Sequence, residues 1–225
     1  MKTLNELLDI EETGWNRIKE ELKNASNHYE ILTKDSTRAN NELLNSQITT
    51  HSRIGAIIYE TGGILIDHGS LRILGSGNEK LNRGLIEWNQ GKTILHLDEP
   101  PSYLLIADDV IGGFFAINNG GLGVNIGDIY YFSPDTLEWE NLEVDYSHFL
   151  AWGFSGDINQ FYDSLRWKTW AVDLQQLQGD QCFSFFPFLW TKEGKDIENV
   201  DRKIITIDEN YWVTISFYKQ LNQEL

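Results

Sequence analysis

The sequence predicts an α+β protein in which helices flank a mostly antiparallel sheet. Apolar residues recur at helical spacing near the N-terminus, β-prone runs occupy the middle of the chain, and an aromatic-rich segment follows. The stretch 103–139 is the most informative, because its apolar runs alternate with Gly, Asn, Asp and Pro. Such alternation is typical of an antiparallel meander.

Three helices are expected before residue 50. Apolar side chains share one face in 4–8 and again in 15–22, where Glu and Lys residues occupy the other side. A third, short helix is expected at 39–44, and the polar segment 33–41 is expected to be a surface connection. These segments should supply part of the helical layer that flanks the sheet.

A further helix and a hairpin should come next. Ser52 is a suitable N-cap, because a serine hydroxyl can accept from the first free N–H groups of a helix. Gly62-Gly63 suits a left-handed turn at the end of that helix. The β-prone runs 64–66 and 71–74 flank the turn composition of 67–70 and predict a β-hairpin.

The middle of the chain predicts the centre of the sheet. A short helix is expected at 85–90, and neighbouring strands are expected at 103–107, 114–118 and 129–132. The connection 108–113 has to reverse the chain, and its two glycines supply the backbone freedom for that reversal.

The C-terminal part is predicted to be a helical, aromatic-rich extension. Asp145 and Asp157 can each cap a helix, and 13 of the 28 aromatic residues lie between 146 and 190. The segment 192–202 is expected to be a charged loop, while 208–225 suits a strand in its first half and a helix in its second.

Composition narrows the function classes. The net charge of −16 disfavours nucleic-acid binding, because such a surface repels phosphates. It would attract a basic protein partner by long-range steering, although the interpretation favoured on charge alone is that it keeps an aromatic-rich chain soluble. No apolar run approaches the roughly 18 residues of a membrane helix, and acidic residues interrupt the N-terminus where a signal peptide would be apolar. We therefore expect a cytoplasmic protein without a membrane partner.

Two pairs of residues form the candidate functional surface. Asp67 and His68 lie in the predicted hairpin turn, and Asp108 and Asp109 follow the predicted strand 103–107. Two carboxylates can divide acid and base roles, and an acidic neighbour can orient a histidine base. Adjacent strand residues point to opposite faces, however, and Asp-Asp before Gly-Gly also suits a turn in which carboxylates accept backbone N–H groups. The turn interpretation is favoured, and no catalytic residue is assigned.

Other partial motifs add no chemistry. A predicted strand follows Gly120–Gly123, so that segment offers no helix N-terminus for a phosphate. The segment Gly153–Gly156 is not a nucleophile elbow, because that motif needs a glycine two residues beyond its serine and Asp157 occupies that position. Cys182 lies among aromatic residues, as a buried inert thiol does, and a single cysteine excludes an internal disulfide or a multi-cysteine metal site. We expect neither a metal nor a cofactor.

Several tracts together resemble a known group of proteins. Helices, a short strand, and then a strand ending in Ala107-Asp108-Asp109-x-x-Gly112-Gly113 resemble the SUKH superfamily, which includes the yeast Smi/Knr cell-wall regulators and many bacterial immunity proteins. More closely, the chain resembles a bacterial family of uncharacterised function allied to that superfamily. The tracts that carry this closer resemblance are 55–63, 66–69, 72–77, 107–118, 133–139, 161–167 and 187–193.

The resemblance implies a SUKH-like α+β core over residues 1–156, with the extension 157–225 packed on it as one globular unit. It brings no established catalytic residues. The function hypothesis is a non-enzymatic cytoplasmic protein-binding module with an immunity or regulatory role. The alternatives are a hydrolase or other enzyme that uses Asp67, His68, Asp108 and Asp109, and a structural oligomer built through the aromatics of 183–190. Convergence of the four side chains in a deep pocket would favour catalysis, and the oligomeric state stays open.

Overall fold

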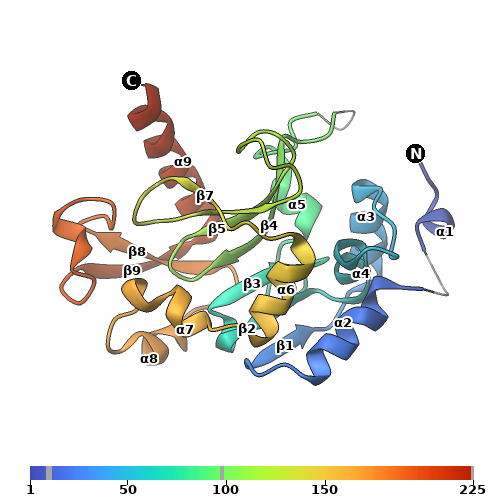
Figure 1. Ribbon diagram of the computed structural model, residues 1–225, viewed down its shortest axis with the longest axis horizontal. Coiled ribbons are helices and arrows are strands. Elements are labelled where there is room, and N and C mark those ends of the chain that lie inside the picture. The colour runs from blue at the N-terminus through green and yellow to red at the C-terminus, as the bar shows by residue number, and fades with distance from the viewer. Residues whose placement is uncertain (9–11, 97–98, 224–225) are drawn as a thin grey trace.

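A computed structural model of the protein describes residues 1–8, 12–96 and 99–223 (Figure 1). Within these ranges, seven strands form one antiparallel sheet in which each strand pairs with its neighbours in the chain. The strands of this sheet are β1 (Tyr29–Leu32), β2 (Gly63–Ile66), β3 (Leu71–Leu74), β4 (Tyr103–Asp109), β5 (Phe114–Asn118), β6 (Ile129–Phe132) and β7 (Trp139–Asn141). The α+β class and the meander predicted from the sequence are therefore confirmed.

Helices and a separate hairpin complete the chain. A second antiparallel sheet contains β8 (Gln181–Phe186) and β9 (Asp201–Thr206). The α-helices are α1 (Leu4–Leu7), α2 (Gly14–Lys23), α3 (Ser36–Ser46), α4 (Arg53–Glu60), α5 (Leu85–Asn89), α6 (Tyr146–Ser155), α7 (Ile158–Phe161), α8 (Trp170–Leu174) and α9 (Ile207–Gln223). Short 3₁₀ helices are η1 (Asp67–Gly69), η2 (Asp163–Leu165) and η3 (Glu193–Lys195). The helices α2 to α4 gather at one end of the molecule, and β8, β9 and α9 lie at the other (Figure 1).

The two faces of the large sheet are covered by different helices. Adjacent residues of β5 point in opposite directions, as strand geometry requires. The ring of Phe115 lies 5.1 Å from that of Phe149 in α6, whereas the ring of Phe114 lies 5.3 Å from that of Tyr211 in α9. Both phenylalanines are fully buried. The sheet is thus the middle of three layers, and the C-terminal helix closes one of its faces.

A lysine fastens α9 to the segment after α5. The Lys92 ammonium lies 4.0 Å from the centre of the Trp88 ring and 5.5 Å from that of Tyr211, and it pairs with Asp208 at 2.8 Å. A cation held between aromatic faces and a carboxylate gains from the ring quadrupoles as well as from the ion pair. This contact joins segments on either side of residue 156; the division into a core and an extension stays a prediction.

Several predicted boundaries are wrong. The segment expected as a polar connection contains the start of α3, because Asp35 accepts the N–H of Arg38 as an N-cap, and β1 just before it was not predicted. The helix capped by Ser52 ends at Glu60 with an extended Thr61, so Gly62-Gly63 forms no left-handed cap; Gly63 opens β2.

The extension is not wholly helical. It contains the β8–β9 hairpin, and β9 begins within the segment expected as a charged loop. The C-terminal segment whose structure the sequence left open is helical from Ile207 to Gln223, and residues 224–225 lie outside the described residues. Among the described residues, no helix has both the length and the apolar character that a membrane span requires.

Candidate functional site

Asp108 occupies the centre of a buried ionic network. The β3–β4 register places it opposite Arg72, and its Oδ1 lies 2.6 Å from Nε of that residue. Its Oδ2 lies 2.6 Å from the guanidinium of Arg83, which also pairs with Asp180. The remaining donors of Arg72 reach backbone carbonyls, one of them that of Gln181 at the start of β8. Both carboxylate oxygens are therefore engaged by internal cations.

Asp109 points to the other side of the strand and organises the turn. Its Oδ1 accepts the N–H groups of Ile111 and Gly113 at 3.0 and 2.8 Å, and its Oδ2 accepts the hydroxyls of Tyr131 and Tyr162 at 2.9 and 3.0 Å. Burial raises the pKa of Asp109, and the hydrogen bonds from Gly113, Tyr131 and Tyr162 oppose that rise. Its contacts match the turn chemistry expected from the sequence, although β4 itself extends through both aspartates.

Asp67 and His68 lie in the turn between β2 and β3. Both residues have positive backbone φ angles, 49° and 58°, which residues other than glycine rarely adopt. Asp67 accepts the hydroxyl of Ser70 at 2.9 Å and pairs with Arg166. The exposed His68 ring stacks on that of His28, with the ring centres 4.1 Å apart.

The four predicted residues are close in the fold but do not converge. The turn and the end of β4 are neighbours, because the N–H of Val110 donates to the carbonyl of Ser70 at 3.0 Å. A cavity of about 70 Å³ between these segments is lined by His68 and Arg72, and none of the three aspartates lines it. No group of three His, Cys, Asp or Glu side chains in the described parts of the chain is placed to hold a metal ion.

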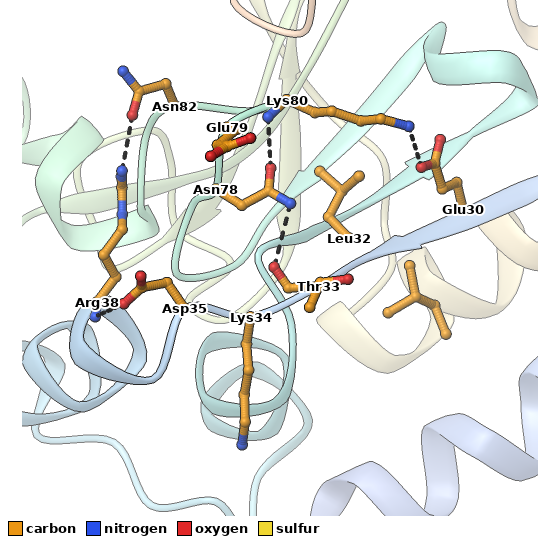
Figure 2. Close-up of a pocket in the computed structure, with 11 residues that line it drawn as sticks. Glu30, Leu32, Thr33, Lys34, Asp35, Arg38, Asn78, Glu79, Lys80 and Asn82 are labelled. Carbon is orange, nitrogen blue, oxygen red and sulfur yellow. Dashed lines mark hydrogen bonds and ion pairs between the residues drawn. The ribbon is translucent and has the colours of Figure 1, made fainter.

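A larger hollow lies beside β1, at one edge of the large sheet (Figure 2). Its volume is about 530 Å³, and β1, the start of α3 and the loop 78–82 line it. The lining includes Lys34, Arg38 and Lys80. We call this feature the charged hollow.

Every cation of the charged hollow already has a partner. Lys80 pairs with Glu30, Lys34 with Glu60 at 3.2 Å, and Arg38 with Glu87 at 2.7 Å. Figure 2 shows the first of these pairs, between Lys80 of the loop and Glu30 of β1. An anionic ligand would have to displace these acidic side chains, and the lining contains neither His nor Cys to serve as a base or nucleophile. The Lys80–Glu30 pair joins the loop 78–82 to β1, and a hydrogen bond of 2.8 Å from Arg38 to Asn82 joins the same loop to α3.

A third hollow lies between the β8–β9 hairpin and α9. Its volume is about 260 Å³. Its lining is Ile111, Pro134, Phe183, Ser184, Phe185, Phe188, Leu189, Trp190, Lys203, Ile205, Glu209, Asn210, Val213 and Thr214. We call it the aromatic groove. The Phe188 and Trp190 rings stack at 4.2 Å, and both pack against Phe217 of α9.

Sequence reasoning found this groove only in part. The density of aromatics in 183–190 was a signal, and it led to the oligomer hypothesis. The contributions of Glu209 and Val213 were missed, because the sequence did not predict a helix in the first half of the segment 208–225. Cys182, next to the groove-lining Phe183, is buried as predicted, and burial raises the pKa of its thiol to about 12.

One buried acid lies outside all three regions. Glu42 of α3 accepts the N–H groups of Ile86 and Glu87, at 2.6 and 3.2 Å, where α5 begins. Desolvation raises its pKa to about 7, although the two hydrogen bonds favour the carboxylate. The position of this group at a helix N-terminus explains why a buried acid is tolerated there.

Comparison with known proteins identifies relatives. The model of the family described as "Protein of unknown function DUF2625" matches residues 4–210. An "Uncharacterized protein" of Haemophilus influenzae is 50% identical over 209 residues, which is 93% of this chain and 87% of that protein. The "Putative uncharacterized protein YbfG" of Escherichia coli is 43% identical over 93% of this chain and 94% of its own length. No solved structure matches the chain.

Proposed function

The chain belongs to the family Protein of unknown function DUF2625, and we propose that it is a non-enzymatic protein-binding module that captures a basic protein partner. An immunity or regulatory role is the finer form of the proposal. A cytoplasmic location is also part of it, and fractionation of the native host tests that part.

The distribution of charge carries the proposal. The span 93–165 contains twelve acidic residues and no lysine or arginine, so most of the net charge of −16 arises there. Asp108 and Asp109 are buried, but Glu138, Glu140, Glu143 and Asp145 are exposed around β7, the far edge of the large sheet. A surface with one sign of charge steers an oppositely charged protein toward it and accelerates association.

The fate of the candidate catalytic groups supports the non-enzymatic part. Asp108 is held by two guanidinium groups and Asp109 by turn amides and tyrosines. Asp67 pairs with Arg166. A general base needs a side chain within reach of a substrate proton, and these carboxylates face internal donors. No observation specifically favours the alternative of a hydrolase.

The resemblance to the SUKH superfamily supports the immunity or regulatory part. Toxins that act on nucleic acids carry basic surfaces, and an acidic immunity protein would complement them. A toxin gene beside the gene for this chain, together with protection of cells that express the toxin, would establish the role. Toxin-exposed cells that die at the same rate with and without this protein would exclude immunity to that toxin.

The binding experiment uses partner capture from the native host, followed by association rates across a salt series. The variant pair Glu138→Gln with Glu143→Gln removes charge near β7, and the matched control Glu20→Gln with Glu79→Gln removes the same charge from α2 and the loop 78–82. All four side chains are exposed. We expect a several-fold slower association at low salt for the first variant only, and convergence at high salt as screening grows. Association that ignores salt would contradict the proposal.

A further inference from the structure

We propose that the aromatic groove receives one large apolar side chain from a segment of the partner that is rich in lysine or arginine. This inference rests on the proposed function and names the anchor by which the partner is held. The groove lies between the β8–β9 hairpin and α9, at the end of the molecule opposite α2 to α4 (Figure 1).

The size of the groove selects a side chain over a cofactor. Sites for small molecules span roughly 300–1,000 Å³, and the groove, at about 260 Å³, is below that range. A single aromatic or long aliphatic side chain fits such a volume. Pockets that bury one anchor of this kind provide most of the affinity at protein interfaces.

The two buried polar side chains that line the groove, Asn210 and Thr214, already donate hydrogen bonds to backbone carbonyls. The amide of Asn210 donates to the carbonyl of Gly112 at 3.0 Å. The hydroxyl of Thr214 donates to the carbonyl of Asn210 at 2.8 Å. Both side chains are buried and are satisfied by backbone groups. An apolar guest therefore leaves none of these donors unpaired.

The rim of the groove remains apolar where it meets solvent. Phe186 at the end of β8 is 68% exposed, and Val213 on α9 is 39% exposed. Adjacent exposed apolar residues around a concave site mark an interaction surface more often than isolated ones do.

Charge at the rim selects the residues that flank the anchor. Glu209 is exposed on the α9 side, and its carboxylate makes no ion pair within the described ranges. Pro134 forms part of the wall. The next residue, Asp135, already pairs with Lys195 at 3.4 Å, and the acidic residues Glu138 to Asp145 follow it in the chain. Lys203 on β9 carries the opposite charge, so the basic residues of the partner should lie toward Glu209 and the exposed acidic residues that follow Asp135. The groove thus borders the same acidic surface that attracts the partner.

The test uses three fluorescein-labelled peptides with the full chain. The first has a tryptophan between two Lys-Lys pairs, the second replaces the tryptophan with alanine, and the third replaces the lysines with glutamates. Fluorescence polarisation measures the affinity of each for the wild type, for Val213→Arg and for Val213→Trp. The second variant fills the groove without adding charge. Val172→Arg and Val172→Trp are matched controls, because Val172 is 63% exposed on α8 and does not line the groove.

We expect the lysine–tryptophan peptide to bind the wild type and both Val172 variants equally, and the two Val213 variants about tenfold more weakly. The alanine and glutamate peptides should also lose about tenfold. Equal affinity for wild type and both Val213 variants would overturn the assignment of the groove. Equal binding of the tryptophan and alanine peptides would overturn the anchor, and equal binding of the lysine and glutamate peptides would overturn the basic flank.

Two outcomes separate this inference from the proposed function. A native partner that dissociates from Val213→Trp no faster than from wild type would overturn the groove assignment and leave the binding module intact. Association of that partner at a salt-independent rate would contradict the proposed function, whatever the peptides do. A wild-type dimer in sedimentation that Val213→Arg dissociates would assign the groove to a second copy of the chain and overturn the proposal.

Discussion

The ionic network around Asp108 and the aromatic groove are linked through β8 and through the segment that follows β4, yet they have opposite properties. Asp109 ends β4 inside the protein, and Ile111, two residues later, lines the groove. In β8, the carbonyl of Gln181 accepts from Arg72, while Phe183 lines the groove. The ionisable residues are buried and paired, and the accessible hollow is apolar. The ionisable side chains that could take part in catalysis therefore stabilise the fold. The surface that remains accessible to a partner is suited to binding.

The difference has a simple energetic basis. Ionic groups removed from water are stable only while their partners remain, so the loss of one partner is costly. The apolar side chains at the rim of the groove are partly exposed to water in the folded protein. Their substitution should therefore change the free energy of unfolding little. Substitutions in the two regions should therefore affect different observables.

The largest effect is expected for Asp108→Asn. The substitution leaves the buried guanidinium groups of Arg72 and Arg83 without their shared anion, and removal of one partner from a buried pair costs about 3–5 kcal/mol. Urea unfolding monitored by tryptophan fluorescence measures this loss. Asp180→Asn is the control, because that carboxylate also pairs with Arg83 but is 38% exposed, and solvent screening limits its effect to about 1 kcal/mol or less. Equal losses in the two variants would contradict the central role of Asp108.

Glu42 is a buried acid that makes no ion pair among the described residues, and its effect on stability should have the opposite dependence on charge. The pKa of Glu42 in the folded protein is about 7, above the usual value of 4.5, so the folded state binds more protons between these pH values. The stabilising contribution of the protonated group is complete below pH 4.5 and is lost as pH rises through 7. Relative to Glu42→Gln, the wild type should lose up to about 3 kcal/mol over this window, at 1.36 kcal/mol per pKa unit. Urea unfolding of both proteins from pH 4 to 8 measures it, and a pH-independent difference would contradict the pKa.

Asp109→Asn should cost less, about 1 kcal/mol. The asparagine oxygen can still accept the turn N–H groups, and its amide can donate to Tyr131 and Tyr162, whose hydroxyls can accept as well as donate. The same urea series measures this change. The contrast with Asp108→Asn sharpens the comparison, since the two neighbours differ mainly in whether they neutralise a buried cation. A loss as large as that of Asp108→Asn would show that the charge of Asp109 is also required.

The sequence was sufficient for the parts of the fold that depend on local signals. The alternation of apolar runs and turn residues located β4, β5 and β6, and Ser52, Asp145 and Asp157 were recognised as N-caps. It was insufficient where tertiary contacts decide. The run from Tyr211 to Ile215 is β-prone, but it is helical because a helix places Tyr211 against Phe114 and Tyr218 against Phe132. Packing against the sheet thus overrides local propensity.

The candidate site could be predicted only at its anchoring residues. The sequence predicted that Asp108 and Asp109 precede a glycine turn. The partners of Asp108, however, are Arg72 and Arg83, which lie 36 and 25 residues away in the chain. No local pattern connects residues at such distances. The aromatic groove is assembled from still more distant segments, between Ile111 and Thr214, so its shape exists only in the folded chain.

The smallest effect on stability is expected for Val213→Arg, within about 0.5 kcal/mol of wild type. Val213 is 39% exposed on α9, so an arginine there can extend its charged end into water while its aliphatic stem covers the groove. Urea unfolding should therefore overlay that of the wild type, in the same preparation whose peptide binding is weakened. A loss of unfolding free energy as large as that of Asp108→Asn would show that the groove wall is part of the core. The assignment of one region to stability and the other to binding would then be wrong. Unchanged stability together with weakened peptide binding would support the separation of the two regions. Val213 would then contribute to the complex with the partner and not to the stability of the folded chain.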